Sequence, residues 1–191
     1  MASKKPVISM IVAALKPSYG IGYQGKMPWR LKQEIRYFKE VTSLGNNAVV
    51  MGRKTWESIP AKFRPLPDRI NVVLSRSVPE GNKVDNVIYA KSFDEALAKL
   101  DSLNVDNVFV IGGAQIYNTL ASDPRVTHLY LTEVTSTNPE VAMDTFLDFD
   151  WSQWHQQPSS QLEAVVGHAL DRDITEGDFT YNYTLWTKET K

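Results

Sequence analysis

Cysteine is absent from this chain of 191 residues. Because thiolates bind iron–sulfur clusters and most structural zinc ions, and act as nucleophiles in cysteine hydrolases, these three classes of site are excluded. A disulfide-stabilised secreted domain is excluded too, and the composition fits a reducing compartment, so we expect a cytoplasmic protein. The three histidines, His128, His155 and His168, lack the spacing of metal ligands, and no metal site is expected.

A charge excess of one sign and a long apolar run are also missing. The 21 Lys and Arg residues against 22 Asp and Glu residues leave a formal net charge of -1, which argues against nucleic acid or an anionic membrane as the main partner. No apolar run approaches the roughly 18 residues of a membrane-spanning helix. The Gly-x-Gly-x-x-Gly fingerprint, the phosphate loop and the Gly-x-Ser-x-Gly elbow are absent, which disfavours an ordinary Rossmann domain, a P-loop nucleotidase and a serine hydrolase.

The sequence does contain a series of short apolar runs rich in β-branched residues. Most are continuously apolar instead of alternating with polar residues, which is typical of strands covered on both faces. Stretches with helical periodicity separate these runs, and this order predicts βαβ units and a largely parallel sheet. The predicted strands are 7–14, 48–51, 70–74, 87–89, 108–111 and 126–134, and the predicted helices are 29–41, 54–58, 93–100 and 115–120.

Two further runs, 164–170 and 180–187, flank a polar stretch near the end of the chain, with Gly177 as a turn signal. We predict that they form an antiparallel strand pair appended to the sheet. The fold class is therefore α/β, a single domain over residues 1–191 with a mixed, mostly parallel central sheet flanked by helices. No repeat or linker divides the chain, and segment 136–158 shows no readable pattern.

One acidic side chain of the first predicted helix lies apart from its charged face. At about 100° per residue, Leu31, Ile35 and Phe38 form one apolar stripe, and Glu34 lies beside that stripe. Desolvation raises the pKa of such a carboxyl unless donors satisfy it, and a ligand with two N–H donors would satisfy both oxygens. From spacing alone, pairing of Glu34 with a nearby Arg or Lys is the simpler interpretation.

Small and cationic residues follow three of the predicted strands. In open parallel sheets, ligands bind beyond the carboxyl ends of the strands, where helix starts present free N–H groups to anions. These segments therefore predict a polyanion site, and their basic side chains favour NADP over NAD because NADP carries an extra ribose phosphate. The segments are 52–55, 75–77 and 112–114, and the basic side chains are Arg53, Lys54 and Arg76.

Several segments, taken in order along the chain, resemble the dihydrofolate reductase family. They are Ile21 to Trp29 with Glu34 after it, Met51 to Pro60, Pro67 to Arg69, Leu74 to Arg76, Ile111 to Tyr117, and Thr132-Glu133. The resemblance covers essentially the whole chain and is strongest to eukaryotic, fungal members. It implies NADPH-dependent reduction of 7,8-dihydrofolate to tetrahydrofolate, with a hydride passing to C6 of the pterin and a proton to N5.

The resemblance also implies roles for individual residues. Glu34 would accept hydrogen bonds from N3 and the 2-amino group of the pterin and favour protonation at N5 through water, with Thr132 and Trp29 as the other catalytic residues. Phe38 would pack on the pterin, and Arg69 would pair bidentately with the carboxylate of the glutamate tail. The implied substrate-binding residues are Ile11, Val12, Met27, Glu34, Ile35, Phe38, Ile59, Phe63, Leu66, Arg69 and Tyr117.

The cofactor implied by the resemblance is NADPH, with its pyrophosphate cradled at residues 113–117. A cis peptide bond between Gly112 and Gly113 and closure of loop 21–29 over the site are expected as well. The implied cofactor-binding residues are Ala13, Ile21, Gly22, Gly52, Arg53, Lys54, Thr55, Leu74, Ser75, Arg76, Ile111, Gly112, Gly113, Ala114, Gln115, Ile116 and Tyr117.

Two alternative functions remain open at this point. A pyrimidine reductase of riboflavin synthesis shares the fold but need not share an acid at position 34, and a noncatalytic NADP-binding module would use only the cations at the strand ends. NADPH oxidation with dihydrofolate or with the pyrimidine substrate distinguishes them. The expected partners are dihydrofolate and antifolate inhibitors, with no nucleic acid and no membrane, and we expect a monomer.

Overall fold

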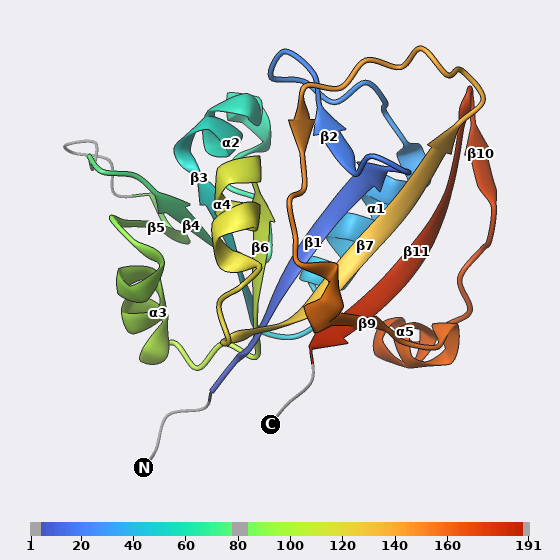
Figure 1. The fold of residues 1–191 in the computed structure, drawn as a ribbon. Coiled ribbons are helices and arrows are strands. Elements are labelled where there is room, and N and C mark those ends of the chain that lie inside the picture. The colour runs from blue at the N-terminus through green and yellow to red at the C-terminus, as the bar shows by residue number, and fades with distance from the viewer. Residues whose placement is uncertain (1–4, 78–83, 189–191) are drawn as a thin grey trace.

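The computed structural model describes residues 5–77 and 84–188, and these form one mixed sheet with helices on both faces (Figure 1). The strands in these ranges are β1 Val7–Leu15, β2 Gly20–Gly22, β3 Asn47–Gly52, β4 Ile70–Leu74, β5 Val87–Ala90, β6 Asn107–Gly112, β7 Val126–Ser136, β8 Thr145–Phe146, β9 Trp154–Gln156, β10 Ile174–Glu176 and β11 Phe179–Lys188. The α-helices are α1 Lys32–Thr42, α2 Arg53–Ser58, α3 Phe93–Asp101, α4 Ala114–Leu120 and α5 Ser159–Val166, and short 3-10 turns lie at Ala61–Phe63 and Trp151–Gln153.

The strand order of the sheet is β10-β11-β7-β1-β6-β3-β4-β5. All neighbours from β7 to β5 in this order are parallel, whereas β11 pairs antiparallel with both β7 and β10. The predicted fold class, a mostly parallel sheet with an antiparallel pair from the end of the chain, is therefore confirmed. Because β1, β3 and β6 are neighbours, the residues that follow β3 and β6 meet at one edge of the sheet.

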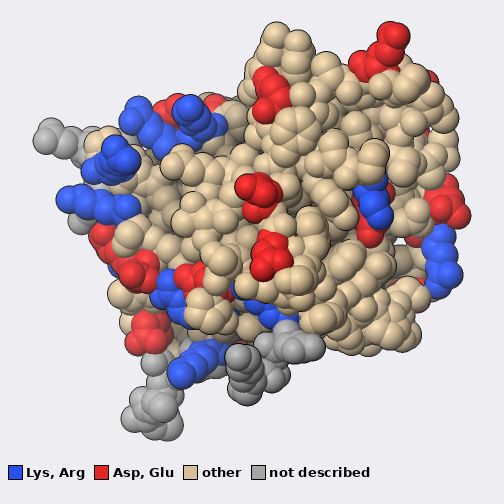
Figure 2. All heavy atoms as spheres, in the orientation of Figure 1, with Lys and Arg blue, Asp and Glu red and all other residues tan. Residues whose placement is uncertain are grey.

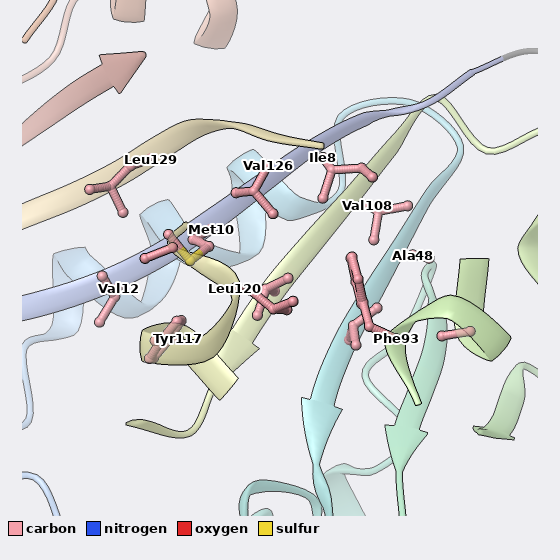
Figure 3. Close-up of a cluster of buried hydrophobic side chains, with 14 of the residues drawn as sticks. Ile8, Met10, Val12, Ala48, Phe93, Val108, Tyr117, Leu120, Val126 and Leu129 are labelled. Carbon is pink, nitrogen blue, oxygen red and sulfur yellow. The ribbon is translucent and has the colours of Figure 1, made fainter. Parts of the chain in front are cut away.

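Alternate residues of each central strand point to opposite faces, so two cores form. In β1, Met10 belongs to the core covered by α3 and α4 and lies beside Tyr117 and Leu120 of α4 (Figure 3), while Ile11 packs on the other face with α1 and α5. Each fully buried side chain of this size contributes roughly 1.5–3 kcal/mol relative to exposure. The continuously apolar runs in the sequence reflect this coverage of both faces.

The face that α1 buries differs from the predicted stripe. Tyr37 and Val41 are its buried apolar residues, and the Ile35 side chain is 50% exposed. The helix also starts at Lys32 and not at Trp29, because Leu31 still has an extended backbone with φ −103° and ψ 108°. Trp29 packs instead edge-on against Phe179, with ring centroids 5.5 Å apart.

The prediction of a strand at 164–170 is wrong. Residues up to Val166 belong to α5, and Gly167 ends this helix with a left-handed backbone of φ 84°, which glycine adopts without strain. The strand that pairs with β11 is instead β10, Ile174–Glu176. Segment 136–158 contains β8 and β9, which the sequence pattern did not indicate because each has at most three residues.

A side-chain cap begins α3, where Ser92 and Glu95 have the spacing of a capping box. The Ser92 hydroxyl accepts a hydrogen bond of 3.0 Å from the Glu95 N–H, as a capping box requires. The Glu95 carboxylate, however, accepts from the N–H of Lys91 and not from that of Ser92. None of the helices in the described ranges has the length and apolar character of a membrane span.

Candidate active site

Glu34 and Thr132 come together from elements that are far apart in the sequence. Glu34 lies in the first turn of α1, and Thr132 lies in β7, where its side chain is fully buried between β1 and β11. The Thr132 hydroxyl donates a hydrogen bond of 3.4 Å to Oε1 of Glu34. Helix α1 therefore turns Glu34 toward the sheet, on the side of its buried residues Tyr37 and Val41 and not beside the stripe that the sequence predicted.

Burial dominates the electrostatics of Glu34. It raises the pKa of the Glu34 carboxyl to about 7, and the hydrogen bond from Thr132 offsets part of that rise. Among the residues that the structure describes, no Lys or Arg forms an ion pair with Glu34, so the ion-pair interpretation is not the one observed. The carboxyl thus changes its charge near neutral pH without a cationic partner.

The charge of Glu34 affects the pKa values of three nearby tyrosines. Burial raises the pKa values of the Tyr37, Tyr117 and Tyr183 hydroxyls, and the charge of Glu34 raises them further. All three are therefore neutral near pH 7. The proton that Glu34 takes up or releases has no competitor among them.

Tyr117 connects the region of Glu34 to the end of β6. Its buried hydroxyl donates a hydrogen bond of 2.7 Å to the carbonyl of Ile11 in β1. A Cβ added at Gly112 would lie 3.6 Å from the same hydroxyl. The acid and the glycine pair after β6 therefore border the same segment of β1.

The predicted apolar wall divides into buried and open residues. Ile11 is buried, and Phe38, Ile59 and Leu66 pack partly buried against the core on the α1 side of the sheet. Ile35, Phe63 and Met27 are 50%, 58% and 63% exposed, and exposed apolar side chains that lie together are typical of a binding surface. The Val12 side chain lies instead in the core on the α4 side of the sheet (Figure 3), and its contact with substrate stays a prediction.

Arg69 is held by the protein itself. The residue is only 5% exposed, its Nη1 donates to the Thr42 hydroxyl at 2.8 Å, and its Nε donates to the Pro67 carbonyl at 2.9 Å. The Thr42 hydroxyl in turn donates to the carbonyl of Phe38 in α1. Two of its five N–H donors thus fix the guanidinium plane, and its proposed partner, a substrate carboxylate, stays a prediction.

Three glycines bring two helix starts together at the edge of the sheet. The Gly112–Gly113 peptide bond is cis, as predicted, and Gly112 has φ 135°, a conformation that disfavours other residues. A Cβ on Gly52 would lie 2.8 Å from Cδ1 of Ile116, and Cβ atoms on Gly112 and Gly113 would lie within 3.4 Å of the Thr55 hydroxyl. Helices α2 and α4 therefore begin side by side, on caps with no side chain to occupy their first N–H groups.

Basic side chains gather at this edge. Figure 2 shows Lys and Arg over α2 and the adjoining end of β4, and the exposed Arg53, Lys54 and Arg76 belong to these segments. Arg53 is already engaged, because its Nε donates to Oε1 of Glu57 at 2.8 Å. The Ser75 hydroxyl, at the end of β4, bonds to the backbone of Ser77.

The remaining residues predicted to bind a cofactor lie on β1, β2, β4, β6 and α4. Those partly buried are Ala13, Ile21, Gly22, Leu74, Ile111 and Ala114, while Gln115 is exposed on α4. Sequence reasoning missed the residue that holds the loop after β2: Asp144 accepts from the N–H of Gln24 at 2.9 Å and donates its own N–H to the Gly22 carbonyl at 3.0 Å. Asp144 lies in segment 136–158, whose sequence carries no signal for this contact.

A cavity of about 390 Å³ lies elsewhere, between α1 and the turn after α5. It is lined by Arg36, Glu40 and His168 among others, and it includes none of the predicted site residues. His168, which the sequence did not indicate as a metal ligand, contacts the Glu40 carboxylate at 2.5 Å. This contact links α1 to the turn after α5, and Glu34 does not line the cavity.

Comparison with known proteins agrees with this geometry. The family model for dihydrofolate reductase matches residues 7–175. The chain is 55% identical to the dihydrofolate reductase of Candida albicans, covering 97% of this chain and 99% of the relative, and 38% identical to that of Saccharomyces cerevisiae, covering 95% and 92%. The structure of Schistosoma mansoni dihydrofolate reductase superposes with a TM-score of 0.77 at 31% identity, covering 97% of this chain and 100% of that one. The chain belongs to the dihydrofolate reductase family.

Proposed function

We propose that this chain reduces 7,8-dihydrofolate to 5,6,7,8-tetrahydrofolate with NADPH, and that Glu34 is the residue that governs protonation. The observation that carries the proposal is the pairing of Glu34 with Thr132 in a largely buried position that raises the pKa of the carboxyl to about 7. A group with this pKa exchanges a proton at the pH of the cell, which is what a reaction that consumes one proton requires.

The substrate would bind against the apolar face beside Glu34. There the carboxylate accepts hydrogen bonds from N3 and the 2-amino group of the pterin, and Phe38 packs on the ring. Glu34 favours protonation at N5 through an intervening water. Apolar side chains such as Ile11 and Ile59 exclude the remaining water, which strengthens each polar contact in the cleft.

At the outer end of the cleft, Arg69 would receive the carboxylate of the glutamate tail. Its bonds to Thr42 and Pro67 support this role, because they orient the guanidinium before the substrate arrives. Trp29 would close the inner end together with the loop that carries Met27. Antifolates with the same pair of N–H donors would occupy the same position beside Glu34.

The edge of the sheet fits NADPH. The donor set is two uncapped helix starts, the Thr55 hydroxyl facing the Gly112–Gly113 peptide, and the exposed basic side chains of α2 and β4. NADPH, when bound, supplies the hydride that is transferred to C6. Arg53 and Lys54 would hold its phosphates, and the segment from Gly113 to Tyr117 would hold its pyrophosphate.

The test is substitution of the acid. Glu34→Gln should reduce turnover with dihydrofolate by roughly a hundredfold to ten-thousandfold, the usual contribution of a general acid or base, while the Kd for NADPH changes less than twofold. The matched control is Glu40→Gln on the outer face of the same helix, which should keep normal turnover. Unaltered turnover in Glu34→Gln would refute the assignment.

The same assay addresses the two alternatives. NADPH oxidation that depends on the pyrimidine substrate of riboflavin synthesis, and not on dihydrofolate, would indicate the related reductase. NADPH binding without oxidation in either case would indicate a noncatalytic module. We also propose that the chain acts as a monomer in the cytoplasm, which sedimentation of the purified protein and fractionation of cells would check.

A further inference from the structure

Helix α1, which carries Glu34, has no cap of its own. The residue at the cap position is Leu31, whose side chain cannot accept a hydrogen bond. The N–H groups of Lys32 and Gln33 instead donate to Oε1 and Oε2 of Glu176, at 2.9 Å and 3.3 Å. Glu176 lies in β10, more than 140 residues further along the chain.

Tyr181 completes this arrangement from the neighbouring strand. Its side chain is fully buried in β11, and its hydroxyl donates a short hydrogen bond to the Glu176 carboxylate. Burial and the Glu176 carboxylate raise the pKa of this hydroxyl, and the backbone of Glu34 lowers it. Because the N–H of Ile35 already bonds to the Leu31 carbonyl, the helix start leaves the N–H groups of Lys32, Gln33 and Glu34 open, and the Glu176 carboxylate accepts from the first two.

We propose that Glu176 and Tyr181 form a positioning pair that fixes the first turn of α1, and with it the Glu34 side chain, relative to the substrate cleft. The proposal rests on the proposed function of Glu34 and adds two residues that do not touch the substrate. Glu34 is the third residue of α1, so any shift of the first turn moves its carboxyl directly.

The pair also acts through charge. The open N–H groups of a helix start carry a partial positive charge that favours an ionised carboxylate nearby. Burial alone would raise the pKa of Glu176, but the bonds from Tyr181, Lys32 and Gln33 lower it, so Glu176 is ionised at neutral pH. Its negative charge offsets the helix start and leaves Glu34 free to keep a proton near pH 7. The other groups facing Glu34, namely Tyr37, Tyr117 and Tyr183, are neutral at this pH.

Three variants separate geometry from charge. Glu176→Gln removes the charge and one of the two acceptor oxygens, Glu176→Asp keeps the charge on a shorter side chain, and Tyr181→Phe removes only the hydroxyl. The controls are Glu95→Gln, which removes an acceptor at the start of α3, far from Glu34 in the sequence, and Asp178→Asn in the β10–β11 turn. For each, kcat is measured from pH 5.5 to 9, together with KM for dihydrofolate, Kd for NADPH and the melting temperature.

We expect Glu176→Gln to lower kcat roughly tenfold at pH 7, within the hundredfold that a misplacement of 1 Å can cost. The midpoint of its pH profile should fall by about half a pH unit, since the positive helix start is no longer offset. Glu176→Asp should restore the midpoint but only part of the rate, and Tyr181→Phe should change both in the direction of Glu176→Gln by a smaller amount. Kd for NADPH should stay within twofold throughout.

The proposal is overturned if Glu176→Gln and Tyr181→Phe lower the melting temperature as Glu95→Gln does but leave kcat and the pH midpoint unchanged, since both residues would then be purely structural. If Glu176→Gln does not fold, the result for Tyr181→Phe decides by the same criterion. Failure of the proposed function is distinct, because it appears as full turnover in Glu34→Gln, whatever the result at position 176.

Discussion

The hydroxyl of Thr132 donates a hydrogen bond to the carboxyl of Glu34 across the interface between β7 and α1, at 3.4 Å. The bond is long, and its effect on the Glu34 pKa opposes the larger effect of burial. Burial raises the pKa of Glu34 to about 7, and the hydrogen bond from Thr132 keeps this pKa lower than burial alone would make it.

Replacing Thr132 by Val should raise the pKa of Glu34, because the variant keeps the shape of the side chain and loses the donor to the carboxylate. A titration of the Glu34 carboxyl by carbon-13 NMR, in the protein without ligands, measures this directly, and the decline of turnover with rising pH should move to higher pH with it. Thr135→Val on the same strand is the control, since the Thr135 hydroxyl bonds to the Thr180 carbonyl and not to Glu34. A lowered Glu34 pKa would contradict the prediction.

Glu34 should also make the ligand-free protein less stable at high pH. Its carboxyl has a pKa of about 7 in the fold against 4.5 when unperturbed, so the folded protein binds more protons than the unfolded chain between these values. Stability from this group is complete below pH 4.5 and is lost as pH rises through 7, by at most about 3 kcal/mol. Glu34→Gln lacks this titrating group and therefore this loss. In urea unfolding, the free energy of unfolding of the variant should rise relative to that of the wild type from pH 4.5 to 8.

The control for this measurement is Glu140→Gln, which alters an exposed glutamate and should leave the pH dependence of unfolding unchanged. Equal pH dependence in Glu34→Gln and the wild type would mean that Glu34 has an ordinary pKa. The prediction concerns the free energy of unfolding and not turnover, so it checks the burial of the acid independently of its proposed role.

Local patterns were sufficient to predict the central sheet and its helices. The strand predicted at 70–74 coincides with β4, and continuous apolar runs indicated the double coverage of β1, β3 and β6. Helical periodicity separated Glu34 from the charged face of α1, but the apolar stripe that it indicated was wrong at Ile35, which is exposed. The glycines at 52, 112 and 113 were readable as a site only as a group, and the cis bond only through the family resemblance.

What could not be read depends on contacts between distant segments. The ring of Tyr37 stacks on that of Tyr183 in β11, with centroids 3.9 Å apart. This contact orients α1 so that Tyr37 is buried and Ile35 is exposed. The capping of α1 by Glu176 has no local sequence signal. Leu31 occupies the cap position, and the side chain that accepts from the helix start, Glu176, lies more than 140 residues further along the chain. Gly167 ended a helix where a strand was predicted, because an apolar run of this length fits either structure.

Removing Glu57 should strengthen NADPH binding. Arg53 donates its Nε to Glu57 across one turn of α2, and both side chains are exposed, so the pair itself contributes little stability. In Glu57→Gln the guanidinium keeps its place and a nearby negative charge disappears, which should lower the Kd for NADPH about two- to fivefold at low salt and less at high salt. The control is Asp94→Asn. Asp94 lies on α3 and forms an ion pair with Arg125, and its replacement should leave the Kd for NADPH unchanged. Weaker binding in Glu57→Gln would show that the pair orients Arg53 for the phosphate.

Gly52→Ala should create a steric clash with Ile116, and a second substitution at Ile116 should relieve it. The new Cβ would lie 2.8 Å from Cδ1 of Ile116, a contact closer than carbon atoms tolerate, and the nearest backbone atoms of Gly112 and Gly113 are 3.9 Å away. The strain thus falls on one side-chain methyl group, and the single variant should lose about 1–3 kcal/mol of stability and bind NADPH more weakly. Ile116→Val removes that methyl group, so the double variant should recover most of both losses in a double-mutant cycle. If the two substitutions are instead additive, the cost of alanine at position 52 comes from the backbone approach to the cofactor and not from the contact with Ile116.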